Sequence, residues 1–301
     1  PGQKERLTST TEVYQSAPES VLVAPNVMDF RNRPRTDRKK VEELRAHYGI
    51  ETKDLLFLAP ERPIPRKKLI YTCNIIDQIA AEAENHECKP ENIKLMFTHP
   101  AGDEGTDYWQ AVQAHARAKG ITIILAADDI WGEKSLFSLG EAYSACDMVI
   151  CTPSNEGFGN APLEAAYYKK PIIISTYDVY KEYIEPKGIK CIEVEHLKEA
   201  DDESSTPALQ DGTIDKIYAV LRDETIRRER YTDPNYKTGL KHFSLDSARE
   251  VLIEAKNLLG RPIQPLKAEK AEKRRPRRMR KYRTEAEVPR LKAGDVIFNM
   301  V

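Results

Sequence analysis

The sequence predicts an α/β protein built on a doubly wound parallel sheet, and three observations carry that prediction. Short apolar runs recur between residues 55 and 194, and stretches with apolar positions three to four residues apart separate them. Near-continuous apolar strands are typical of parallel sheets whose two faces are both covered by helices. The chain has 301 residues, which is enough to bury such a core without disulfides or metals.

Six apolar runs are predicted to be strands, with helices before, between and after them. The strands are expected at residues 55–59, 93–97, 121–126, 147–151, 171–175 and 189–194. The helices are expected at residues 36–48, 67–86, 107–119, 135–145, 160–169, 178–185, 211–222 and 244–259. Asp107 is a candidate N-cap, and Gly49 and Gly120 are candidate helix stops.

Composition divides the chain into three parts. Residues 1–20 are a polar lead-in or the remnant of an interdomain linker, residues 21–260 form the α/β domain, and residues 261–301 are a basic extension. The net charge of -1 argues against nucleic-acid binding by the whole chain. The basic run at 273–283 is interpreted as a solvated or partner-docking segment, and contact with an anionic membrane surface or RNA is the alternative.

The apolar runs, the cysteines and the histidines bear on the cellular compartment of the protein and on whether it binds a metal. No stretch approaches the roughly 20 apolar residues of a membrane span, and the start of the sequence lacks the apolar core of a signal peptide. The five cysteines form no C-x-x-C pair, and the six histidines show no metal-ligand spacing. A cytoplasmic protein with free thiols, three of them buried, and no metal site is therefore expected.

The first loop that suggests chemistry follows the predicted strand at 55–59. It spans residues 60–68 (PERPIPRKK) and holds four cations on a segment stiffened by prolines. In open parallel sheets, ligands bind at the carboxyl ends of the strands, which is where this loop begins. One interpretation is that Arg62 and Lys67 face a bound phosphate, and the alternative is a solvated charged loop.

The second such loop spans residues 152–165 (TPSNEGFGNAPLEA). Its two glycines allow the backbone to approach a ligand closely, and Asn160 is a candidate cap for a helix whose first N–H groups would bind an anion. Glu156 and Glu164 bracket the loop. Because carboxylates repel phosphate, their expected partners are the hydroxyls of a sugar or ribose. The alternative is a glycine-rich connection with two solvated glutamates.

The spacing from Glu156 to Glu164, E-x7-E in the setting E-G-F-G-N-A-P-L-E-A, resembles the donor-binding half of retaining glycosyltransferases of family four. These are the group 1 transferases with a GT-B fold. Residues 23–30 resemble the family's interdomain linker, 142–147 the segment before its P-S strand end, and 242–245 the start of its late helix. The resemblance covers the predicted α/β domain and implies a Rossmann-like, nucleotide-sugar-binding unit.

The resemblance also implies a reaction, which is hexosyl transfer from a nucleoside-diphosphate sugar to an acceptor hydroxyl with retention, without metal or other cofactor. Glu164 would hold the ribose hydroxyls and Glu156 would contact the transferred sugar. Arg62 and Lys67 would neutralise the diphosphate, so these two cations and Glu156 are the expected catalytic residues. The loop would contact the sugar and phosphate through Gly157, Phe158, Gly159, Asn160 and Ala161.

Three features depart from the family pattern. The segment at 153–156 is one residue shorter, and residues 98–105 (THPAGDEG) replace a simpler glycine loop, which leaves His99 and Asp103 without a role. The family has an acceptor-binding domain before the linker, and only about 20 residues precede the linker in this sequence. We therefore expect the acceptor site to be supplied by a further domain or by a partner subunit. Asp128 and the acid after it lack the D-x-D spacing of a metal pair.

Two other functional classes remain open on the sequence. One is a non-catalytic module that binds a nucleotide sugar or only a partner. The other is a GT-B epimerase or phosphorylase.

Overall fold

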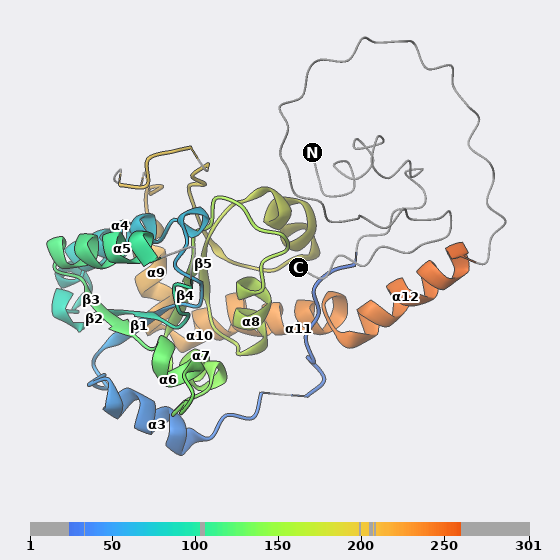
Figure 1. Cartoon of the computed structure of the whole chain (residues 1–301), viewed down its shortest axis with the longest axis horizontal. Helices are drawn as coiled ribbons and strands as arrows, with labels where there is room; N and C mark the ends of the chain where they lie inside the picture. Colours follow the sequence, from blue (N-terminus) through green and yellow to red (C-terminus); the bar gives the residue numbers. More distant parts are fainter. Residues whose placement is uncertain are drawn as a thin grey trace, which may run out of the picture. The chain divides into compact units, whose positions relative to one another are not determined.

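The centre of the protein is a six-stranded parallel sheet, seen in the computed structural model that describes residues 24–32, 34–102, 106–198, 200–204, 207 and 209–259 (Figure 1). The strands lie in the order β3-β2-β1-β4-β5-β6. Their bounds are β1 Leu55–Ala59, β2 Ile93–Phe97, β3 Thr122–Leu125, β4 Met148–Cys151, β5 Ile172–Ser175 and β6 Ile192–Val194. The predicted α/β fold with a doubly wound parallel sheet is confirmed.

Helices cover both faces of this sheet, as the apolar strands require. In Figure 1, α4 (Leu69–Ala81) and α5 (Thr106–Ala118) lie on one side, and α3 (Arg38–His47), α6 (Ala127–Trp131) and α7 (Leu139–Ala145) lie on the other. Successive residues of β1 point to opposite faces, so that Phe57 packs with the α4 and α5 side chains and Leu58 with the α3 and α7 side chains. α9 (Thr213–Arg222) joins the first layer and α8 (Ala161–Tyr167) the second.

The direction in which strands are added reverses at β1, and this reversal positions the site. β1 pairs with β2 from Leu55 opposite Ile93 and with β4 from Phe57 opposite Met148. The carboxyl ends of β1 and β4 are therefore neighbours. In open α/β sheets the crevice at such a switch point is where ligands bind.

The remaining elements follow the sheet or connect its strands. Short turns of 3-10 helix are η2 Pro65–Lys67, η3 Glu84–His86, η4 Pro90–Asn92 and η6 Glu185–Lys187, and π-helical turns are η5 Tyr180–Ile184 and η7 Arg227–Thr232. The last helices are α10 Glu224–Ile226, α11 Asp233–His242 and α12 Leu245–Leu259. Residues Pro25–Ala248 form one compact unit, and the rest of α12 belongs to another.

Several element boundaries differ from the predicted ones for local reasons. α4 begins at Leu69 because Pro65–Lys67 form a separate 3-10 turn and Lys68 takes a left-handed conformation with φ 51°. Asp107 lies inside α5, which begins at Thr106, so it is not the N-cap. Gly49 and Gly120 both have positive φ after a helix end, as the stop signals predicted.

Apart from short 3-10 turns, two helical segments were not predicted from the sequence. They are the short helix α6 and the helical stretch at 224–242. The expectations for residues 1–20, for the extension at 261–301 with its basic run, and for Asp103 lie outside the described residues.

Candidate functional site

The two loops singled out in the sequence meet at the carboxyl edge of β1 and β4. The main-chain oxygen of Arg66 accepts hydrogen bonds from the backbone N of Ser154 at 2.8 Å and from its Oγ at 3.1 Å. Below them, the hydroxyls of Thr72 and Thr152 are 2.7 Å apart in a buried contact. These bonds join loops that are about ninety residues apart in the chain and make one surface of them.

A cluster of four charged side chains occupies this surface. Lys67 Nζ lies 2.8 Å from Glu61 Oε1 and is also bonded to Glu156 Oε1. Arg66 Nη1 lies 3.2 Å from the other oxygen of Glu156 and 3.1 Å from the main-chain oxygen of Asn155. The two cations and two carboxylates balance, so the cluster is neutral. The structure thus brings the predicted residues Lys67 and Glu156 into direct contact.

Arg62 takes a different position from the one that pairing with Lys67 would suggest. Its side chain is exposed, and among the described residues it has no hydrogen-bond or ion-pair partner. It lies near His99, at the end of β2. Burial, together with the positive charges of Lys67 and Arg62, lowers the pKa of His99 to about 4. Arg62 therefore adds uncompensated positive charge at the same edge, next to a neutral imidazole.

The glycine loop that carries the E-x7-E spacing is held from below by an aromatic side chain. Gly159 has φ 86°, and a Cβ at this position would collide with the hydroxyl of Tyr177. The same hydroxyl donates a hydrogen bond of 3.2 Å to the main-chain oxygen of Phe158, whose ring is buried against Phe243. Gly157 is half-buried beside them. The buried side chain of Phe158 is therefore not available to a ligand.

Asn160 occupies the N-cap position of α8 as predicted, but its side chain does not cap the helix. Its backbone is helical, with φ -78° and ψ -30°, and its side chain makes no capping bond. Instead its Oδ1 accepts a hydrogen bond of 2.8 Å from Nδ2 of Asn26. α8 begins at Ala161, which is buried. An asparagine that has already entered helical conformation cannot turn its side chain back onto the first N–H groups.

Glu164 lies one turn into α8 and is held by a buried tyrosine. Its Oε2 accepts a hydrogen bond of 2.5 Å from the hydroxyl of Tyr143, which is fully buried and stacks on Tyr168 with ring centroids 4.9 Å apart. Burial raises the pKa of Glu164, and the bond from Tyr143 partly opposes that shift. The second oxygen, Oε1, accepts no hydrogen bond from the described residues, so it can accept one from a hydroxyl of a ligand.

The acid that follows Asp128 has structural partners. Asp129 Oδ2 accepts a hydrogen bond from the Tyr48 hydroxyl at 2.6 Å and lies 3.0 Å from Nε2 of His47. Across the described ranges, no group of three or more His, Cys, Asp or Glu side chains is placed to hold a metal ion. Within the same ranges, no helix combines the length and the apolar character needed to cross a membrane.

Three residues of the site were not predicted. Glu61 and Arg66 were visible in the basic loop but were not assigned, because nothing local to the sequence shows that they meet Lys67 and Glu156. Tyr143 lies on α7, and its bond to α8 depends on the packing of two helices. The sequence offered one indication of a role for Glu61, Arg66 and Tyr143. Each has a hydrogen-bonding side chain close to a predicted strand.

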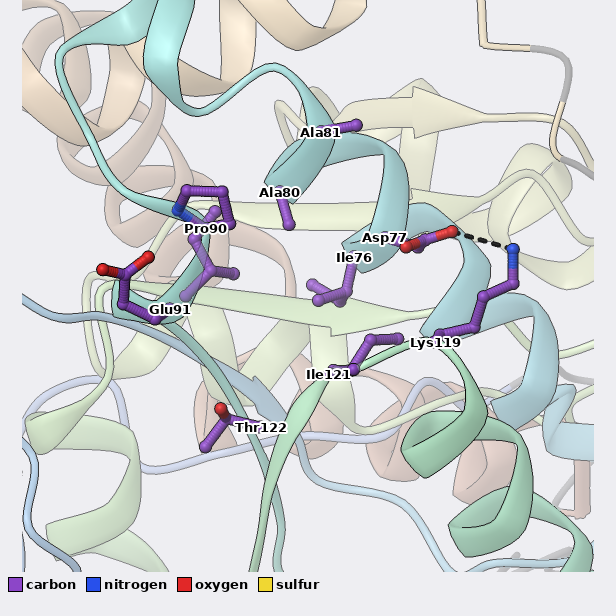
Figure 2. A pocket seen from close by; sticks show the side chains of 11 residues that line it. Ile76, Asp77, Ala80, Ala81, Pro90, Glu91, Lys119, Ile121 and Thr122 are labelled. Carbon is purple, nitrogen blue, oxygen red and sulfur yellow. Dashed lines mark hydrogen bonds and ion pairs between the residues drawn. The ribbon is translucent and has the colours of Figure 1, made fainter.

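A separate pocket of about 400 Å³ lies away from this site, between the C-terminal half of α4 and the starting ends of β2 and β3 (Figure 2). Its wall is mostly apolar, with Ile76, Ala80 and Ile121 among the lining residues. An ion pair of 2.9 Å between Asp77 and Lys119 closes one side. None of the predicted site residues lines it.

Comparisons with known proteins agree with this fold. Residues 113–224 match the family model described as glycosyl transferases group 1. The mannosylglucosylglycerate synthase of Thermotoga maritima is 27% identical over 246 residues, which cover 77% of this chain and 55% of that protein. The enzyme of the same name from Petrotoga mobilis is 28% identical over 187 residues, covering 57% and 43%. The chain thus spans about half the length of these curated relatives.

Solved structures show the same architecture at low sequence identity. Anabaena Alr3699/HepE, crystallised with UDP and glucose, superposes with a TM-score of 0.53 at 16% identity, covering 77% of this chain and 55% of that one. A glycosyltransferase from Rickettsia africae superposes with a TM-score of 0.61 at 14% identity, covering 85% and 62%. The family model, the curated relatives and the Rossmann-like fold all show that this chain is similar to the group 1 glycosyltransferases.

Proposed function

We propose that this chain supplies the nucleotide-sugar-binding half of a retaining GT-B glycosyltransferase, which transfers a hexosyl group from a nucleoside-diphosphate sugar to an acceptor hydroxyl. One observation carries the proposal: the sheet order joins the cationic loop after β1 and the E-x7-E loop after β4 at one switch point. Structural neighbours in complex with UDP and with UDP-glucose support the ligand class.

Each group at the edge suits a different part of such a donor. Oε1 of Glu164 would accept the ribose hydroxyls, because Tyr143 already occupies the other oxygen. Arg62 and Lys67 would face the diphosphate. Glu156 would accept hydroxyls of the transferred sugar, and the backbone of residues 157–161 would lie along the sugar and phosphate.

Catalysis would be mainly electrostatic. Negative charge grows on the diphosphate as the sugar leaves, and fixed cations in a partly dry site stabilise that charge. Arg62, Arg66 and Lys67 would provide those cations without a metal ion. With retention, the leaving phosphate would take the proton of the acceptor hydroxyl on the same face of the sugar. The acceptor would be bound by parts of the protein outside the Rossmann-like unit described here.

Calorimetry with UDP, ADP, GDP and the free nucleosides tests the donor site. Glu164→Ala should weaken binding of the preferred diphosphate about ten- to a hundredfold, because a charge-assisted hydrogen bond is worth roughly 1.5–3 kcal/mol. Arg62→Ala should weaken diphosphate binding more than nucleoside binding. Glu84→Ala, in an exposed turn after α4, is the matched control and should change neither affinity. Equal losses of diphosphate and nucleoside affinity in Arg62→Ala would contradict the phosphate role.

The second candidate is a binding module without turnover, and the pairing of Lys67 with two carboxylates, which neutralises an expected catalytic cation, favours keeping it. A glycosyl-transfer assay separates the two, run on the 301-residue chain alone and on the same chain together with an acceptor domain. We expect turnover only in the second case. Robust turnover by the chain alone would show that the acceptor site lies within it.

We also infer that the protein works in the cytoplasm, where thiols stay reduced. All five cysteines are free in the structure, and Cys73, Cys146 and Cys151 are buried. Mass spectrometry of the protein isolated from its native source under alkylating conditions would show five reduced thiols.

A further inference from the structure

The two carboxylates that share Lys67 are not equivalent, and the first difference is burial. Glu61 comes from the end of β1 and its side chain is 2% exposed, whereas the Glu156 side chain, on the glycine loop, is 9% exposed. Oε2 of Glu61 is the single buried side-chain nitrogen or oxygen without a hydrogen-bond partner in the described part of the chain. A weak donor close to it is the thiol of Cys151. Burial is the main cause that raises the pKa of this thiol, and the nearby carboxylate of Glu61 is the second.

The second difference is the number of cations that each carboxylate has. Glu156 keeps Arg66 at 3.2 Å on its Oε2, so it stays neutralised if Lys67 moves away from Oε1. Glu61 has Lys67 and no other ion-pair partner among the described residues. A buried charge that loses its one counter-ion is strongly destabilising. Breaking the ion pair between Lys67 and Glu61 therefore requires more free energy than breaking the ion pair between Lys67 and Glu156.

The backbone on either side of Lys67 is fixed as well. Lys68 has a left-handed backbone, and its Nζ donates a hydrogen bond of 2.9 Å to the main-chain oxygen of Asp201. On the other side, the main-chain oxygen of Arg66 is bonded to Ser154. The backbone of Lys67 is thus held in place, and its ammonium group is positioned by the two carboxylates that it contacts.

We propose that Glu61 is a positioning residue that fixes Lys67 at the ligand edge, so that a bound diphosphate replaces Glu156 on Lys67 and leaves the Glu61 pair intact. This inference rests on the proposed nucleotide-sugar function. Once released from Lys67, Oε1 of Glu156 becomes available to a sugar hydroxyl while Oε2 stays on Arg66. Binding of the diphosphate and recognition of the sugar are then coupled through one ammonium group.

Two isosteric variants test the proposal because charge alone predicts the wrong sign for one of them. Glu61→Gln and Glu156→Gln each remove one negative charge, so a simple Coulomb argument expects both to bind UDP more tightly. We expect Glu156→Gln to bind UDP about threefold more tightly, and Glu61→Gln to bind it about fivefold more weakly, since Lys67 loses its fixed partner. Uridine affinity should stay within about twofold of wild type in both.

Two matched variants separate the loss of charge at Glu61 from the loss of its position. Glu61→Asp keeps the charge but shortens the side chain, so it should also weaken UDP binding; it carries the same test if Glu61→Gln does not fold. Glu84→Gln, an exposed control, should change nothing. If Glu61→Gln strengthens UDP binding, or weakens UDP and uridine equally, Glu61 is not a positioning residue for Lys67.

A measurement without ligand keeps this inference separate from the proposed function. Double-mutant cycles in urea unfolding, with Lys67→Met, give the coupling of Lys67 to Glu61 and to Glu156. We expect the first coupling to be the larger, and saturating UDP to abolish only the second. If the wild-type chain binds no nucleoside diphosphate, the proposed function fails, but a larger coupling to Glu61 still supports the positioning. If Lys67 is coupled more strongly to Glu156 than to Glu61, the positioning role of Glu61 is wrong.

Discussion

Removing one hydroxyl beneath the candidate ribose site should change both stability and its pH dependence. Tyr143→Phe deletes the donor of the 2.5 Å bond to Glu164 and keeps the ring that stacks on Tyr168. A hydrogen bond to a charged partner is worth about 1.5–3 kcal/mol, and one to a neutral partner about 0.5–1.5 kcal/mol. With Glu164 charged, the variant should therefore lose about 2 kcal/mol of unfolding free energy.

The sign of the pH dependence follows from the pKa of Glu164. Burial raises the folded-state pKa above its ordinary value of 4.5, so the folded protein binds this proton more tightly than the unfolded chain does. The resulting stability is fully present below the unfolded pKa and is lost as the pH rises through the folded pKa. The Tyr143 bond holds the pKa down, so Tyr143→Phe raises it further and steepens the loss. The cost of the substitution should fall to about 1 kcal/mol as the pH is lowered and Glu164 becomes protonated.

Urea unfolding of both proteins between pH 4 and pH 7 measures this difference directly. Tyr168→Phe is the matched control, because its hydroxyl has no hydrogen bond among the described residues, and it should change stability by less than about 0.5 kcal/mol. If Tyr143→Phe costs the same free energy at every pH, the hydroxyl does not interact with an ionising Glu164, and the predicted coupling between the two residues is wrong.

Three further predictions concern the loop, a helix cap and the thiols. Gly159→Ala should lower the free energy of unfolding by at least about 1–2 kcal/mol in thermal unfolding, because φ is positive and the added Cβ collides with the Tyr177 hydroxyl. Adding Tyr177→Phe should restore part of this loss. If it restores none, the collision does not contribute to the loss. Ser138→Ala should cost about 1 kcal/mol, because Ser138 and Glu141 form a capping box on α7, and an unchanged melting temperature would contradict this. In the folded protein at pH 8, a thiol reagent should modify the half-buried Cys88 before Cys73, because burial raises the pKa of Cys73 to about 12. Equal rates of modification would contradict this and would show that local unfolding exposes Cys73 on α4.

Local sequence patterns are sufficient to establish the class of fold and the position of both loops. Apolar runs such as Leu55–Ala59 and Met148–Cys151 lie on strands because strands buried on both faces need nearly every residue apolar. The chemistry-bearing loops then follow from position, since each begins where a strand ends. The same local patterns placed Gly49 and Gly120 at helix ends. These features depend on residues close together in the chain, so a single sequence reveals them.

Polar helices gave a weaker local signal. The stretch at 224–242 was not predicted because it contains Pro234 and Gly239 and has few apolar positions. Gly239 is explained only by its neighbour, since a side chain there would collide with the ring of Phe30, more than two hundred residues earlier. That helix is stabilised by a distant contact rather than by its own periodicity.

The side chains that meet at the switch point, by contrast, could be identified only in the folded chain. The sequence placed Lys67 and Glu156 on separate loops and assigned a phosphate to one and a sugar to the other, whereas the fold joins them in one neutral cluster with Glu61 and Arg66. That contact requires β4 to pair with β1, although two other strands lie between them in the chain. Periodicity shows that a residue is on a strand or helix, but the neighbours of that strand are set by packing over the whole sheet, so contacts between loops form only when the chain has folded.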